Sequence, residues 1–190
     1  MKRNMFVIRL SKILAKICEI AHWAGVVCMA LLLVFSIFFR DLLPKYIVLS
    51  ESGETTVGCY GFDINVINAD GSFRIGALII LSIFAIIAFV LMAMVFRNLY
   101  LIIKNISRDT DNTPFSKDNI RMVREIGIFA IAVPVVGQIM QIVAFIALGA
   151  ENVEMSVALD GYMMGLLALG LDQILGYWAR WETGVEKVSR

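Results

Sequence analysis

Long uninterrupted apolar stretches constrain this chain more than any other feature of its sequence. A helix needs about 20 mostly apolar residues to cross a bilayer core about 30 Å thick. Four stretches meet this length, and they cover residues 20–39, 75–96, 126–150 and 155–179. The fourth stretch is the least apolar, because Asp160, Asp172 and Gln173 interrupt it. The pattern predicts an all-α membrane protein, with four transmembrane helices in one bundle.

The composition supports this fold class and excludes several others. Hydrophobic residues make up 59% of the chain and charged residues 17%, whereas soluble domains average about 45–50% and 25%. This balance excludes a soluble globular enzyme and a disordered chain. The net charge of +1 argues against direct nucleic-acid binding, which requires a strongly basic face. We therefore expect residues 1–190 to form a single membrane domain.

The distribution of Lys and Arg predicts the orientation of the chain. Five basic residues precede the first stretch, six lie in the loop at residues 97–125, and three follow the fourth stretch. The loop at residues 40–74 holds three, and the short connection at residues 151–154 holds none. Basic loops stay in the cytoplasm, so both termini are predicted to be cytoplasmic. The first stretch is too long for a cleaved signal peptide and is predicted to be a membrane anchor.

The regions between the apolar stretches carry local structural signals. In the external loop at residues 40–74, β-favouring runs surround the turn signal Ser52-Gly53, which predicts a small hairpin on the membrane surface. Cys59 in this loop is either a small buried residue or a thiol that pairs between chains. In the cytoplasmic loop, Pro114 stops any extension of the preceding helix and Ser116 is a good N-cap. A helix is therefore predicted to begin at Lys117.

The N-terminal segment at residues 5–17 combines apolar residues at helical spacing with a basic face. One interpretation is an interfacial helix that lies on anionic lipid and leads into the first span. The other is a helix that docks on a partner protein. The sequence leaves both open, with the first the commoner arrangement.

Polar residues inside the apolar stretches are candidates for function, because they are costly to place in a bilayer. They are His22, Gln138, Gln141, Asp172 and Gln173. Counting about 1.5 Å of rise per residue places His22 and Asp172 at similar depth, which suggests a hydrogen bond between them, with Gln173 nearby. Such a pair would act as a proton relay or pH sensor, or simply as a polar clamp between helices.

Small residues in the fourth stretch, Gly161, Gly165 and Gly170, permit close helix approach within the bundle or in a homo-oligomer. No catalytic motif is present: the chain has no GxSxG, P-loop or HExxH sequence. The three cysteines form no CxxC pair, so no metal site is expected. We predict a protein without enzymatic activity and without a cofactor.

Two motifs carry a resemblance to a known family. They are TPFSKDNI at residues 113–120, which leads through REIG at residues 124–127, and DGYMMGLL at residues 160–167, followed by DQI at residues 172–174. Together they resemble the bacterial domain-of-unknown-function family 2975. The resemblance implies a small four-span protein of the bacterial cytoplasmic membrane, encoded beside a helix-turn-helix DNA-binding regulator. The C-terminal tail after residue 179 departs from the acidic, glutamine-containing tail that family members often carry.

The first functional hypothesis is therefore a regulatory or sensory membrane protein that sequesters such a regulator at its cytoplasmic face. The residues expected to contact the regulator are Pro114, Phe115, Ser116, Arg121 and Arg124. The alternative is a small transporter or an immunity-type membrane protein that uses the intramembrane polar residues, or a subunit of a larger membrane complex.

Overall fold

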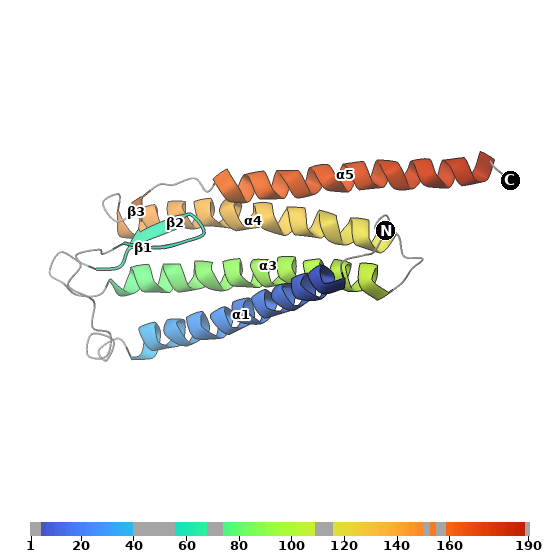
Figure 1. Cartoon of the computed structure of the whole chain (residues 1–190). Helices are drawn as coiled ribbons and strands as arrows, with labels where there is room; N and C mark the ends of the chain where they lie inside the picture. The colour runs from blue at the N-terminus through green and yellow to red at the C-terminus, as the bar shows by residue number, and fades with distance from the viewer. Residues whose placement is uncertain are drawn as a thin grey trace. The chain divides into compact units, whose positions relative to one another are not determined.

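The computed structural model describes residues 5–39, 56–67, 74–108, 116–149, 153–154 and 159–188. This part of the chain is mostly helical, which confirms the predicted class (Figure 1). The helices are α1 (Met5–Phe38), α3 (Ile75–Arg108), α4 (Lys117–Leu148) and α5 (Leu159–Val188). The strands are β1 (Thr56–Cys59), β2 (Phe62–Asn65) and β3 (Val153–Glu154).

Three of the described helices, rather than the predicted four, are long and apolar enough to cross a membrane. They cover Phe6–Phe38, Ile75–Ser107 and Lys117–Leu148. The stretch predicted at residues 155–179 is helical from Leu159 onward, but its average apolarity is lower than that of the others. The reason is the composition of α5, in which Asp160, Asp172, Gln173 and several glycines separate the leucines.

The three apolar helices extend beyond the predicted spans. α1 contains 34 residues, which corresponds to about 51 Å of helix. Residues 5–17, predicted as an interfacial helix or as a helix that docks on a partner, are continuous with the apolar run in one helix. α4 begins at Lys117 as predicted, and the amide of Asn119 donates a hydrogen bond to Ser116 Oγ at 3.3 Å. The predicted N-cap is therefore confirmed.

The chain divides into two compact units. The first comprises Met1–Ala21, Leu91–Ile131 and Asp160–Arg190, and the second comprises His22–Val90 and Ala132–Leu159. Each of the helices α1, α3 and α4 contributes one portion to each unit.

In the first unit, α5 runs antiparallel to the first half of α4 (Figure 1). Asp172 bonds Arg124, and the backbone of Gly165 faces Gly127 and Ile131. Contacts nearer the N-terminus of α5 are therefore made with residues nearer the C-terminus of α4, as expected for antiparallel helices. A methyl group on Gly127 would lie 2.8 Å from the Leu169 side chain. Two glycines therefore let the helix backbones approach closely, as such residues do in membrane proteins.

In the second unit, β1 and β2 form an antiparallel hairpin, and β3 pairs with the other edge of β2. The hairpin turns at Tyr60 and Gly61, whose φ angles are 49° and 76°. Positive φ at both central residues is the type I′ arrangement that matches the twist of paired strands. The expected turn at Ser52-Gly53 lies outside the described residues. The hairpin itself is confirmed, and its turn lies at a dipeptide that was not identified as a turn signal.

The hairpin buries one face and reaches in among the helices. Phe62 and Ile64 are fully buried, and the ring of Phe62 lies 4.9 Å from that of Phe84 in α3. Tyr60 contacts His22, which lies 16 residues before the end of α1, or about 24 Å along the helix. The sequence predicted a hairpin on the membrane surface, whereas its tip lies beside residues of the predicted spans.

The α4–α5 contact gives a first testable expectation. Replacing Gly165 by alanine should destabilise the protein by about 1–3 kcal/mol. The added methyl group would meet the Ile131 side chain and lie 3.0 Å from the backbone O of Gly127 and the backbone N of Ile131. Gly170→Ala is the matched control, because no atom lies within 4 Å of its added carbon. Unfolding in detergent micelles measures both, and equal effects would contradict the contact.

Candidate functional site

A groove lies between α3 and α4 in the first unit, with a volume of about 390 Å³. We call it the α3–α4 groove. Its lining residues from α3 are Met94, Arg97, Asn98 and Leu101, and those from α4 are Asp118, Arg121, Met122, Glu125 and Phe129. Most of them belong to the loop at residues 97–125 that was predicted to be cytoplasmic.

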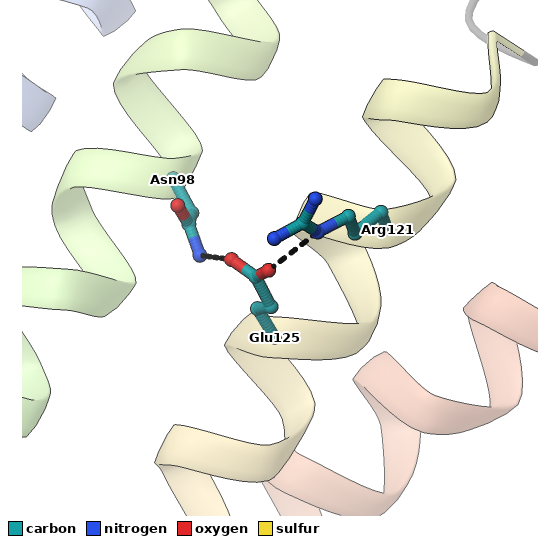
Figure 2. Close-up of polar contacts among 3 residues, drawn as sticks. All are labelled: Asn98, Arg121 and Glu125. Carbon is teal, nitrogen blue, oxygen red and sulfur yellow. Dashed lines mark hydrogen bonds and ion pairs between the residues drawn. The ribbon is translucent and has the colours of Figure 1, made fainter.

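The carboxylate of Glu125 organises the polar side of this groove (Figure 2). One oxygen accepts a hydrogen bond from the Asn98 side-chain amide at 3.0 Å, and the other accepts from Arg121 Nε at 2.9 Å. Asn98 is buried, whereas the Arg121 side chain is 79% exposed. Because Glu125 is held from both helices, its position in the groove is fixed. The exposed guanidinium of Arg121 is available to an incoming group.

The other lining residues make the groove amphipathic. The apolar side chains of Met94, Leu101, Met122 and Phe129 are half-buried, and Arg97 and Asp118 are exposed. Methionine adapts to irregular apolar partners, while the charged residues of both signs offer ion pairs at fixed positions. A groove of this composition suits a protein helix with one apolar stripe.

A second polar pair holds α3 and α4 together farther along the first unit. The side-chain amide of Asn105 donates to Asn119 Oδ1 at 3.2 Å, and Asn119 is 1% exposed. A hydrogen bond to a buried side chain helps to fix the relative position of two helices. The α3–α4 groove is therefore built on a defined helix pair.

Asp172, predicted to pair with His22, bonds Arg124 instead. Arg124 Nε lies 3.0 Å from Asp172 Oδ2, and the Asp172 side chain is 1% exposed. The Gln173 side chain lies 3.5 Å from the same oxygen. Arg124, predicted to contact the regulator, neutralises a buried carboxylate of α5. Since His22 has a partner in the second unit, the His22–Asp172 hypothesis receives no support.

His22 and Gln141 both hold the hairpin tip in the second unit. His22 Nε2 lies 2.9 Å from the Tyr60 hydroxyl, and Gln141 Nε2 donates to the Gly61 carbonyl at 2.8 Å. The rings of His22 and Tyr60 both meet Phe89 edge-on. Gln141, an intramembrane polar candidate from the sequence, thus bonds the hairpin backbone. These intramembrane polar residues therefore provide partners for a hairpin turn among helices.

The remaining predicted site residues fall in different places. Ser116 caps α4, Gly165 lies at the α4–α5 contact, and Gly161 is half-buried. Gly170 faces open space, so it contributes no helix contact within the described chain. Gln138 is half-buried on α4 and has partners of its own. Pro114 and Phe115 lie outside the described residues.

Three residues that matter to these sites were not identified from the sequence. In the sequence, Glu125 and Asn98 lie at the ends of apolar runs, where polar residues are common. In the structure they lie opposite each other on two antiparallel helices and form a hydrogen bond. Tyr60 was not predicted to be a turn residue, because tyrosine rarely adopts a positive φ, which costs roughly 1–3 kcal/mol. Within the described part of the chain, no group of His, Cys, Asp and Glu could hold a metal ion.

Comparisons with protein-family models, with curated proteins and with solved structures found no match. The resemblance that rests on the two motifs at residues 113–120 and 160–167 stays a prediction.

The contacts at the hairpin tip give a second testable prediction, which is measured by the alkylation rate of Cys59. Burial raises the pKa of the Cys59 thiol, so less thiolate is present at a given pH and alkylation is slow. In a chain with Cys18 and Cys28 replaced by alanine, Cys59 should react with a maleimide more slowly at pH 7.5 than a cysteine at the exposed position Phe39. Its rate should rise only at higher pH.

Gln141→Leu should then accelerate alkylation of Cys59, because it removes the hydrogen bond from Gln141 to the Gly61 carbonyl, a loss of about 0.5–1.5 kcal/mol. Ile142→Leu, at an exposed neighbouring position, is the control and should leave the rate unchanged. An unaltered rate in Gln141→Leu would show that this hydrogen bond does not hold the tip.

Proposed function

We propose that the chain is a multi-pass protein of a bacterial cytoplasmic membrane, with both termini and the α3–α4 groove on the cytoplasmic side. Support comes from the Lys and Arg distribution, since six basic residues lie in the loop at residues 97–125. The groove is lined largely by that loop. Opposite orientation would place 14 of the 17 basic residues outside, against the usual bias.

In this arrangement α5 returns through the membrane beside α4. The described residues between 161 and 178 expose mainly apolar side chains, among them Leu166, Leu167, Leu171 and Ile174. The charge of Asp172 is turned inward and paired with Arg124. Tyr177, Trp178 and Trp181 are exposed farther along, and aromatic residues favour the membrane interface. This surface suits lipid despite the modest average apolarity of α5.

The function that the geometry supports best is regulation by binding, in which the α3–α4 groove takes an amphipathic helix of a soluble protein. The observation that carries this proposal is the combination of an apolar floor with fixed charges, Arg121 and Glu125, at its edge. Helix-in-groove recognition uses such surfaces: the apolar stripe supplies affinity, and the charges set register and partner choice.

The class of partner follows from the family resemblance, which implies a small helix-turn-helix transcription regulator. Sequestration at the membrane would keep such a regulator from DNA. The tail after residue 179 differs from the family pattern, so the groove rather than the tail is the proposed contact. The polar residues on which a transport path would depend, His22, Gln141 and Asp172, have partners within the fold, and this favours regulation over transport.

A photocrosslinking amino acid at Arg97, which is exposed and lines the groove, tests this proposal in native membranes. Mass spectrometry should identify one soluble helix-turn-helix protein. Arg121→Ala should reduce the yield about tenfold, as expected for loss of about 1.4 kcal/mol of binding energy. The fold should be retained, because an exposed pair spaced by four residues contributes only about 0.3–0.5 kcal/mol.

Lys117→Ala is the matched control, since Lys117 is an exposed basic residue of α4 outside the groove. Its crosslinking should equal that of the unaltered chain. Capture of only membrane proteins at Arg97, or equal capture by the Arg121→Ala chain, would contradict the proposal.

A further inference from the structure

The α3–α4 groove runs along its two helices and crosses the boundary between their apolar and polar parts. Its inner end is lined by Met94 and Phe129, which lie within the apolar stretches at residues 75–96 and 126–150. Its outer end is lined by Asp118, about 16 Å from Phe129 along α4. The headgroup layer on each side of a bilayer is about 5–8 Å thick. In a membrane-spanning chain, a groove of this length reaches from the lipid tails through the headgroups.

Charged side chains follow one another along this groove in a defined order. Asp118 and Arg121 both line it from α4, three residues or about 4.5 Å apart, with Arg121 farther inward. Arg97 lines it from α3 beside Asn98, and the bond from Asn98 to Glu125 places this part of α3 one turn inward of Arg121. From the outer end inward, the groove therefore presents a carboxylate, two guanidinium groups and an apolar end.

These groups keep most of their capacity to bind an added ligand. The bond between Arg121 and Glu125 uses Nε alone (Figure 2), which leaves both Nη groups of Arg121. The side chains of Arg97 and Asp118 are exposed, and neither bonds another residue in the part of the chain that the structure describes. The second carboxylate of the groove, Glu125, is already held by Asn98 and Arg121. The groove therefore offers two positive groups and, outside them, one negative group.

An aminophospholipid carries complementary groups in the same order. Along the molecule, a primary ammonium is followed by a phosphodiester and then by acyl chains. Arginine binds phosphate through its paired N–H donors, and an alkylammonium such as that of lysine has N–H donors for a carboxylate. The half-buried side chains of Met94, Met122 and Phe129 provide an apolar surface for an acyl chain. Basic pockets between membrane helices on the cytoplasmic side bind phospholipid headgroups in this way.

We propose that the α3–α4 groove holds one phospholipid of the phosphatidylethanolamine class, with its phosphate between Arg97 and Arg121 and its ammonium at Asp118. The groove volume of about 390 Å³ falls within the range of small-molecule sites, about 300–1,000 Å³. Other headgroups are poorer matches. Phosphatidylglycerol has the phosphate but no cation for Asp118, and the quaternary ammonium of phosphatidylcholine has no N–H donor for a carboxylate.

The lipid and the partner helix of the proposed function need the same apolar floor, so the two occupants exclude each other. The helix therefore has to displace the lipid when it binds. This displacement rests on the proposed function, whereas the lipid site requires only that α3 and α4 cross the membrane. Lipid selectivity is measured on the purified chain without any soluble protein, so its failure is distinguishable from a failure of the crosslinking at Arg97.

Native mass spectrometry of the full chain in detergent, with equal amounts of phosphatidylethanolamine and phosphatidylglycerol added, tests the lipid site. The unaltered chain should retain one phosphatidylethanolamine about fivefold more often than one phosphatidylglycerol, which is the upper range for an exposed ion pair. Asp118→Asn should lower this ratio to about one, because the ammonium loses its carboxylate while the phosphate keeps both arginines. Equal retention of the two lipids by the unaltered chain, or an undiminished ratio in Asp118→Asn, would overturn the proposal.

Two further variants separate this site from lipid that is retained anywhere on the surface. Lys117→Gln changes an exposed charged residue that is next to Asp118 but outside the groove, so it should leave the ratio unchanged. Arg97→Gln should lower the retention of both lipids without changing their ratio, because both headgroups contain the phosphate. An equal change of the ratio in Lys117→Gln and Asp118→Asn, or undiminished retention in Arg97→Gln, would overturn the assignment of the groove.

Discussion

Pairing of polar groups among apolar helices is the constraint on which this structure depends. Non-helical backbone at membrane depth is tolerated only where protein surrounds it or where it lines a cavity. The hairpin tip satisfies this condition, because the Gly61 carbonyl accepts from Gln141 and the Tyr60 hydroxyl meets His22. In the first unit, Asp172 is buried beside α4 because Arg124 neutralises it. Each polar residue in an apolar stretch that has such a partner serves to hold a neighbouring element.

Much of the fold could be predicted from local patterns, since length and apolarity specify a membrane helix and a serine before Lys117 specifies where α4 begins. The depth of the hairpin could not, because it depends on Tyr60 meeting a histidine 38 positions away in the sequence. Apolar length predicted four membrane helices, whereas α5 is less apolar than the three helices that are long and apolar enough to cross. The Asp172 carboxylate of α5 is buried against Arg124, and this pairing depends on the position of α4, which the sequence pattern does not give.

The candidate site, too, could be predicted from the sequence only in part. Arg121 was identified from the sequence as a contact residue, and it lines the α3–α4 groove. The groove itself was not identified, because Asn98 and Glu125 acquire meaning only when α3 and α4 lie antiparallel and bring them to 3.0 Å. Arg124 was grouped with Arg121 because both are basic and close in sequence. Although they are three residues apart on one helix, they have different partners. Arg121 bonds Glu125 in the groove, whereas Arg124 neutralises Asp172 of α5.

The central claim is that the α3–α4 groove faces the cytoplasm in a protein that crosses the membrane. Side-specific labelling tests it most directly, in a chain whose three cysteines are replaced by alanine. Arg121→Cys and Phe39→Cys place thiols at exposed positions in the groove and at the end of α1. An impermeant maleimide should label Arg121→Cys only in inside-out vesicles and Phe39→Cys only in right-side-out vesicles. Labelling of both from the same side, or of Arg121→Cys from the outside, would contradict the account.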